Sequence, residues 1–302
     1  MLVDFSPLIK NKNFRWLFIL MFLTRSAGPI YLVALPYQIY HITGSTLWVG
    51  LLSLSELVPL IGMGLLGGVL ADKCDRRKLI LVSGLISAVV SVLLVWNALV
   101  LHPSVLALFL LAFVMSLSSF LARPAVTALT QAIVDKSDFK AVSALTSFSF
   151  NITAIGGPAL TGLMISYWGF GFAYGLNFLI FVMMSLIALC IRFSHKVEKK
   201  AENLGTLESM KQGLKYAMSR EEIFASYIVD MVAMIFGMPN ALFPALAQHL
   251  GGTSVVGFLY AAPAVGALVI SFLYSVAGLQ KLNLMEKGWL FQQSYGVFLL
   301  LA

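Results

Sequence analysis

Long apolar runs recur along the chain, separated by short polar segments. A bilayer core about 30 Å thick takes roughly 20 apolar residues of helix to cross. Runs of that length lie at residues 15–40, 47–71, 79–101, 104–128, 141–167, 170–193, 223–248 and 254–277. A ninth run begins near Trp289 and reaches Ala302 after about 14 residues, too few to cross. The pattern predicts an all-α integral membrane protein with eight full transmembrane helices and part of a ninth, C-terminally truncated.

Composition agrees with a membrane protein. Apolar residues make up 60% of the chain and charged residues 11%, whereas a soluble domain has about 45–50% and about 25%. This excess of apolar side chains must face lipid. The net charge of +7 does not indicate a nucleic-acid partner, because the basic residues sit in short loops rather than on a soluble face.

The basic residues fall in alternate loops. Cytoplasmic loops of membrane proteins carry the excess of lysine and arginine. The loops around His41, His102, Trp168 and His249 contain neither residue type. The basic loops lie around residues 10–15, 73–78, 136–140, 192–220 and 281–287. This alternation predicts a multi-pass membrane protein with a cytoplasmic N-terminus.

One long connection divides the chain. It follows six apolar runs, and within it apolar residues recur at helical spacing between lysines, which indicates an amphipathic helix on the membrane surface. The predicted domains are a six-helix N-terminal bundle at 1–193, a cytoplasmic linker at 194–222 and a partial C-terminal bundle at 223–302.

An internal repeat supports the same division. Residues 35–46 match residues 243–254 at one constant offset. The match aligns Pro36 with Pro244, His41 with His249 and Gly44 with Gly252. Chance is the alternative for three identities. Parallel repeats of helical bundles are nevertheless a known transporter architecture.

The segment GGVLADKCDRRK at 67–78 carries a family resemblance. It resembles the cytoplasmic loop signature of the major facilitator superfamily, and so implies the fold of that superfamily. The matching residues are Gly68, Asp72, Lys73, Arg76 and Arg77, while Asp75 stands where glycine is usual. The glycine allows close helix approach, and the charges offer alternative partners when two bundles rock. A loop merely anchored by its charge is the alternative.

A second segment, GGPALTGL at 156–163, resembles the Gly-Pro signature of facilitator antiporters. Gly157, Pro158 and Gly162 match it, and Thr161 replaces a second glycine. These residues are expected to soften and thin the helix at a close crossing. Glycine and proline are common in membrane helices, but beside the first signature this motif favours an exporter.

Further segments look most like the bacterial enterobactin-exporter branch of the superfamily: VDFS at 3–6, FRWLFI at 14–19 and GFLYAAPAVGA at 257–267. The resemblance implies a secondary active transporter of the bacterial inner membrane, a proton-driven exporter of a siderophore such as enterobactin or of a similar small metabolite. Its partners would be the small-molecule substrate, protons and the lipid bilayer, with no cofactor or metal, and we expect a monomer. A multidrug efflux pump of the same fold and an inactive truncated chain are the alternatives.

Two ionisable residues fall deep inside predicted spans. Arg25 and Glu56 both lie roughly 14–15 Å into their helices, where a charge costs at least about 2.5–3.5 kcal/mol. We hypothesise a pair facing the transport cavity, in which Glu56 exchanges a proton and Arg25 holds the carboxylate or contacts an anionic substrate. A purely structural ion pair is the alternative.

Other polar residues are weaker candidates for the same cavity. Asp230 is a second candidate proton site, or else a solvated residue near the end of its helix. Gln38 and Asn177 either line the cavity or bind neighbouring backbone carbonyls. An enzyme is not expected, because the four histidines are scattered singly among loops and no metal-ligand or phosphate-loop spacing appears.

Overall fold

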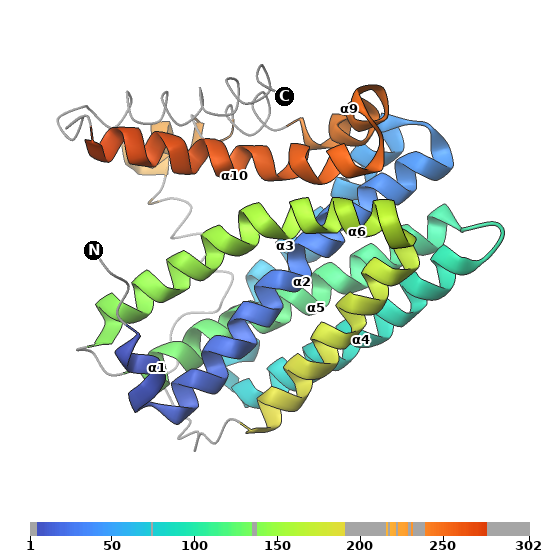
Figure 1. Cartoon of the computed structure of the whole chain (residues 1–302). Coiled ribbons are helices and arrows are strands. Elements are labelled where there is room, and N and C mark those ends of the chain that lie inside the picture. Colours follow the sequence, from blue (N-terminus) through green and yellow to red (C-terminus); the bar gives the residue numbers. More distant parts are fainter. Residues whose placement is uncertain are drawn as a thin grey trace.

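The computed structural model describes residues 5–73, 75–134, 138–190, 216, 218–221, 223–228, 231 and 239–276. Within these residues the regular secondary structure is entirely helical (Figure 1). The first part of the chain contains α1 (Ser6–Lys10), α2 (Lys12–Thr43), α3 (Thr46–Lys73), α4 (Arg76–Leu99), α5 (Val105–Ile133) and α6 (Phe139–Cys190). The second part contains the 3-10 turn η2 (Asn240–Leu242), α9 (Phe243–Leu250) and α10 (Thr253–Val276).

The long helices follow the predicted apolar runs. By length and composition, α2, α4, α5 and α6 are each sufficient to cross a membrane. The 52 residues of α6 contain two predicted spans, and Gly169 interrupts them with a φ of 78°, a conformation that glycine adopts without steric cost. The predicted runs at 141–167 and 170–193 therefore meet in a tight turn at this glycine.

The seventh predicted span differs from the structure. Residues 223–228 are helical, but Pro239 lies outside any helix and is followed by η2 and α9. A single continuous helix over 223–248 is therefore wrong at Pro239. Proline has no backbone N–H for a helical hydrogen bond, so an interruption at this position is compatible with its chemistry. Most of the predicted linker at 194–222, together with Asp230 and the run from Trp289, lies outside the described residues.

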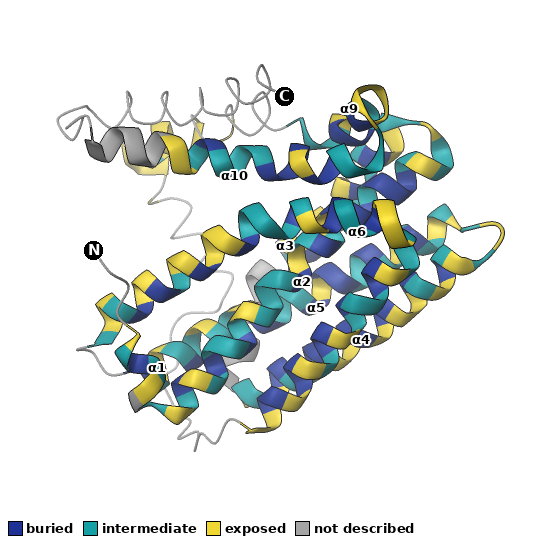
Figure 2. Cartoon of the chain, viewed as in Figure 1, coloured by how far each residue is buried: buried dark blue, intermediate teal, exposed yellow. Residues whose placement is uncertain are grey.

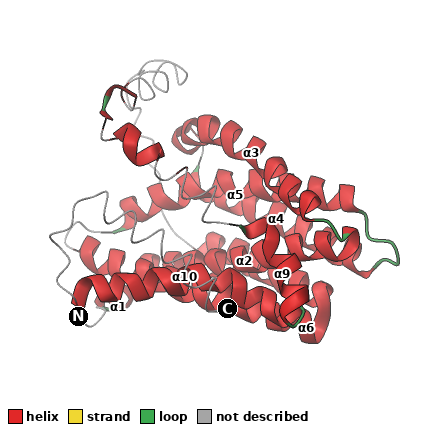
Figure 3. Cartoon of the chain, turned by 90° about the horizontal axis from the view of Figure 1, so that it is seen from above, coloured by secondary structure: helices red, strands yellow, loops and turns green. Residues whose placement is uncertain are grey.

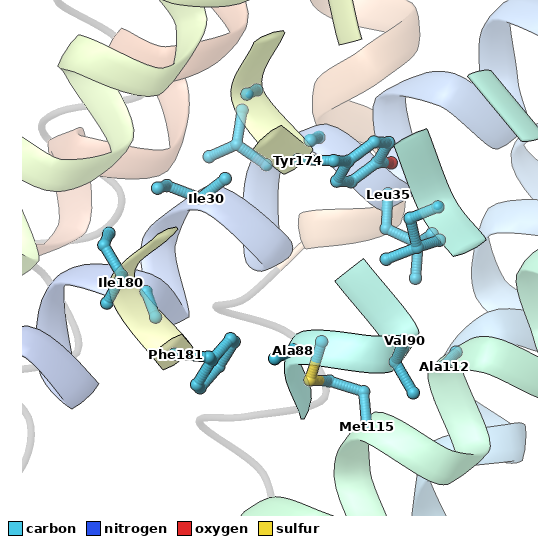
Figure 4. Packing of buried hydrophobic residues seen from close by; sticks show 14 of the residues in the cluster. Ile30, Leu35, Ala88, Val90, Ala112, Met115, Tyr174, Ile180 and Phe181 are labelled. Carbon is cyan, nitrogen blue, oxygen red and sulfur yellow. The ribbon is translucent and has the colours of Figure 1, made fainter. Parts of the chain in front are cut away.

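The long helices α2 to α6 and α10 run alongside one another in a bundle (Figure 3). Helix α6 packs on α2, α4 and α10, and α5 packs on α3 and α4. Buried side chains from α2, α4, α5 and α6 meet between them, as Figure 4 shows for Ile30, Ala88, Met115 and Phe181. Exposed apolar residues cover outer faces of the helices (Figure 2), and Leu57, Val89 and Leu110 are examples. Such a surface is suited to lipid rather than water.

Helix α10 crosses α6 near one end of the bundle. In Figure 1 the two helices lie close together on the side of α9 and separate toward their other ends. The hydroxyl groups of Tyr37 on α2 and Thr253 on α10 share a hydrogen bond of 3.0 Å on the closed side. The two halves of the chain are therefore joined at one membrane end and diverge toward the other.

Candidate functional site

Glu56, on α3, has a phenol as its hydrogen-bond partner. The Tyr31 hydroxyl on α2 donates to Glu56 Oε1 over 2.8 Å, and both side chains are half-buried. A hydrogen bond to an ionised carboxylate is roughly twice as strong as one between neutral groups. The bond therefore helps to hold a carboxylate at a depth where a bare charge is costly.

Other polar groups surround this pair. Ser116 on α5 and Tyr174 on α6 lie close to the Tyr31 hydroxyl, and Tyr260 on α10 lies near enough to interact electrostatically with Glu56. The hydroxyl of Tyr174 donates to Gln38 Oε1 over 2.7 Å, and that of Tyr260 donates to the Asn240 carbonyl over 3.1 Å. We call this group the Glu56 cluster: Tyr31, Gln38, Glu56, Ser116, Tyr174 and Tyr260. It draws side chains from both halves of the chain.

Arg25 is not part of this cluster. Its Nη1 donates to the backbone carbonyl of Thr146 on α6 over 2.5 Å. The predicted pair between Arg25 and Glu56 is therefore not formed in this conformation, because each side chain has a different partner. Arg25 and Tyr31 are six positions apart on α2, which places them about 120° apart around the helix axis. Arg25 and Glu56 are predicted to lie at equal depth in the membrane, but Arg25 faces a different neighbouring helix from the one that carries Glu56.

Gln38 and Asn177 are buried rather than exposed to an open space. Gln38 is 2% exposed and Asn177 is 0% exposed. Gln38 accepts the hydrogen bond from Tyr174, whereas within the described residues neither Nδ2 nor Oδ1 of Asn177 has a partner. Both side chains are closed off from the outer surface in this conformation, and their place in a transport cavity stays a prediction. Asp230, the other candidate, lies outside the described residues.

Two basic residues of the loop motif, Arg76 and Arg77, bind backbone carbonyls of other helices, and those of Arg77 lie at a helix end. Nη1 of Arg76 donates to the Ala128 carbonyl on α5 over 3.2 Å. Arg77 donates through Nε to the Ala188 carbonyl over 2.8 Å and through Nη2 to the Leu189 carbonyl, both in the last turn of α6. A cation at a helix C-terminus satisfies free carbonyls and complements the helix dipole. Gly68, Asp72 and Lys73 lie on α3, and their side-chain surroundings are outside the described part of the chain.

The Gly-Pro motif lies where α6 approaches two other helices. A Cβ atom on Gly157 would lie 2.5 Å from Cγ of Pro29 on α2, and one on Gly162 would lie 2.7 Å from the backbone nitrogen of Gly257 on α10. Beside them, Pro158 contributes a carbonyl that faces Gly257. Only glycine fits such approaches, so the motif permits close contact of α6 with both α2 and α10.

Each matched repeat segment has its glycine at positive φ between two helices, although α9 is capped by Gly251 rather than by the matched Gly252. Gly44 follows α2 with a φ of 63°, and Gly252 precedes α10 with a φ of 87°. His41 and His249 lie in the last turns of α2 and α9 respectively. Each matched segment therefore closes one helix and opens the next.

Comparison with known protein families identifies the family of this helical chain. Residues 3–284 match the sequence model of the transmembrane secretion effectors, a family of the major facilitator superfamily. The chain belongs to this family.

Curated relatives of this facilitator chain include enterobactin exporters named EntS. Those of Shigella dysenteriae serotype 1 (strain Sd197) and Escherichia coli O157:H7 (strain EC4115 / EHEC) are each 29% identical to it over 276 residues. The alignments cover 89% of this chain and 64% of each relative. The chain thus spans just under two thirds of the length of these exporters.

Solved structures show the same fold at low sequence identity. A mutant form of the nucleoside transporter NupG superposes with a TM-score of 0.67 at 14% identity, over 87% of this chain and 68% of that one. A mutant form of the peptide transporter POT, bound to alafosfalin, gives a TM-score of 0.57 at 16% identity, over 90% and 69%. This facilitator chain is therefore classed with transporters rather than enzymes, as its sequence predicted, and is a multi-pass protein of the inner membrane.

Asp75 departs from the usual facilitator loop signature, and the structure gives it a role. It is the N-cap residue of α4, and its Oδ1 accepts a hydrogen bond from the backbone N–H of Arg77 over 2.9 Å. The sequence pattern marked this position only as a departure. An aspartate just before a long apolar run is nevertheless a recognisable helix-start signal.

Replacing Asp75 with alanine is expected to destabilise the protein by about 1 kcal/mol, because the first turn of α4 loses its cap. Thermal unfolding of the purified chain in detergent measures the change. Asp75→Asn is the matched control, since asparagine caps about as well as aspartate. An asparagine variant as unstable as the alanine variant would show that the carboxylate charge, rather than the cap, matters at this position.

Proposed function

We propose that the protein is a proton-driven exporter of a catecholate siderophore such as enterobactin, or of a similar small metabolite, across the inner membrane. The proposed topology has the N-terminus in the cytoplasm, and the proposed functional unit is a monomer. One observation carries the proposal: a carboxylate inside the membrane, Glu56, lies among polar groups from both halves of the chain. Membership of the secretion effector family and similarity to enterobactin exporters support the direction and the substrate class.

Glu56 is the proposed proton carrier. Substrate and coupling-ion sites in transporters built from repeats lie near the bilayer midplane, between the repeats. The ionised carboxylate only accepts hydrogen bonds, whereas the protonated carboxyl group also donates one. Protonation of Glu56 therefore changes which hydrogen bonds Tyr31 and a substrate can form with this side chain. That change couples binding of the proton to binding of the substrate.

Arg25 is the proposed contact for negative charge on the substrate. Its guanidinium group has five N–H donors, and Nη1 is engaged with the Thr146 carbonyl. The side chain is half-buried, so it combines a fixed position with partial access. Among the described residues Arg25 binds a neutral carbonyl rather than an anion. An ionised catecholate would supply the anionic partner.

The arrangement of α6 and α10 is that expected of an inward-facing transporter. In the predicted orientation, the ends at which these helices separate face the cytoplasm (Figure 1). The opposite ends are held together by the Gly162–Gly257 approach and by the hydrogen bond between Tyr37 and Thr253. Export would require this closed end to open and the separated end to close.

Uptake into inside-out membrane vesicles tests the proposal. Vesicles from cells that express the chain are energised by respiration, which acidifies their interior, and are then given radiolabelled enterobactin. Accumulation that collapses on addition of a protonophore is expected. Accumulation of a lipophilic cationic drug without enterobactin would instead support multidrug efflux, and accumulation unaffected by the protonophore would contradict proton coupling.

A further inference from the structure

We infer that Glu56 binds a phenolic hydroxyl group of the substrate, and that Tyr31 occupies the same position on Glu56 while no substrate is bound. The pair would thus set the preference for a ligand that carries adjacent aromatic hydroxyl groups. The ligand class rests on the proposed function, and the inference extends that function by naming the residues that recognise the substrate.

The chemistry of the contact supports this assignment. Tyr31 presents a phenol O–H to Glu56 Oε1 at 2.8 Å. A catechol ring carries the same donor twice, on neighbouring carbons, and a carboxylate has two oxygens with about four acceptor positions between them. A catechol can therefore span both oxygens of Glu56, provided that the tyrosine hydroxyl leaves Oε1.

A second tyrosine pair in the protein provides an internal comparison. The hydroxyl of Tyr174 donates to Gln38 Oε1 over 2.7 Å, and both of these side chains are buried. Tyr31 and Glu56 are only half-buried, although their hydrogen bond has a similar length. The buried pair is shielded from any ligand and stabilises the packing of α2 against α6. The half-buried pair is open to exchange with a ligand of like chemistry.

Because Glu56 lies between the two halves of the chain, replacing the Tyr31 hydroxyl by a ligand affects contacts between these halves. Tyr31 belongs to α2, while Tyr260, which lies near Glu56, belongs to α10. Tyr260 is itself tied to the carbonyl of Asn240, beside the break at Pro239. A ligand that displaces Tyr31 therefore changes contacts at the boundary along which the halves must move.

Equilibrium binding to the purified 302-residue chain in lipid nanodiscs tests the inference. The probes are a neutral catechol amide and its dimethyl ether, which keeps the ring but cannot donate hydrogen bonds. The catechol is expected to bind and the ether not to bind. Glu56→Gln is expected to weaken binding of the catechol at least about tenfold, because a charge-assisted acceptor is lost.

The variant Tyr31→Phe tests whether Tyr31 competes with the ligand for Glu56 or only holds the Glu56 side chain in position. If the tyrosine competes with the ligand, its removal tightens catechol binding by about fivefold, the factor that one net hydrogen bond represents. Tyr40→Phe removes a hydroxyl group elsewhere on α2 and is the matched control, expected to leave the affinity unchanged. Unchanged or weaker binding by Tyr31→Phe, or equal binding of the dimethyl ether, would overturn the inference.

These experiments test the recognition site and the export proposal independently of each other. Catechol binding with the predicted variant pattern but no gradient-driven uptake would contradict proton-driven export and leave the recognition site in place. Gradient-driven uptake of enterobactin without the predicted variant pattern would leave the export proposal in place and overturn the role of Tyr31.

Discussion

Replacing Gly162 with alanine is expected to destabilise the protein by about 1–3 kcal/mol, because the added methyl group overpacks the crossing of α6 and α10. Its Cβ atom would lie 2.7 Å from the backbone nitrogen and 2.8 Å from the Cα atom of Gly257. Both neighbours are backbone atoms, so no change of rotamer relieves the contact and the helices must move apart. Thermal unfolding in detergent should show a midpoint lower by on the order of 5 °C.

Gly156→Ala is the matched control for this prediction. Gly156 lies on the same helix, and a Cβ atom there would meet nothing within 4 Å. Alanine at such a helical position is neutral or stabilising by roughly 0.5–1 kcal/mol. Gly257→Ala adds a methyl group to the same crossing from the α10 side. The loss of stability in the double variant with Gly162→Ala should be smaller than the sum of the losses in the two single variants. Equal stability of the Gly156 and Gly162 variants would show that the crossing is not tight.

The positions of the helices were readable from the sequence because the length of an apolar run is a local property. The turn between the runs at 141–167 and 170–193 and the end of α2 at Gly44 were readable for a similar reason, since glycine commonly closes a helix. The Gly-Pro motif indicated a close crossing without naming its partners. Those partners, Pro29 and Gly257, are distant in the sequence, and only the packed structure identifies them.

The hypothesised pair of Arg25 and Glu56 is not formed in this conformation. Depth in the membrane can be counted along a helix, but the face on which a side chain lies relative to its neighbours depends on helix packing. Arg25 therefore reaches α6 while Glu56 meets Tyr31. A signal for Tyr31 did exist: Tyr31 and Gln38 are seven positions apart and so share one face of an apolar helix. Tyrosine also occurs in membrane helices without any such role, so this signal alone does not identify a site.

Glu56→Gln is expected to abolish proton-driven accumulation of substrate in inside-out vesicles. Glutamine has the size of glutamate and its carbonyl oxygen can still accept the hydrogen bond from Tyr31, but it cannot exchange a proton at physiological pH. Gradient-driven uptake of enterobactin should therefore fall to the level seen with a protonophore. Expression level and thermal unfolding should stay close to those of the unchanged protein.

Two further variants separate loss of the proton site from general damage. Glu221→Gln removes an exposed carboxylate outside the Glu56 cluster and should leave uptake unchanged. Glu56→Asp keeps an ionisable group but shortens the side chain by one methylene, which draws the carboxylate away from Tyr31. This variant should keep a protonophore-sensitive component of uptake while losing affinity for the catechol, because proton exchange needs only the carboxyl group whereas recognition also needs its position. Normal gradient-driven uptake by Glu56→Gln would remove Glu56 from the coupling mechanism altogether.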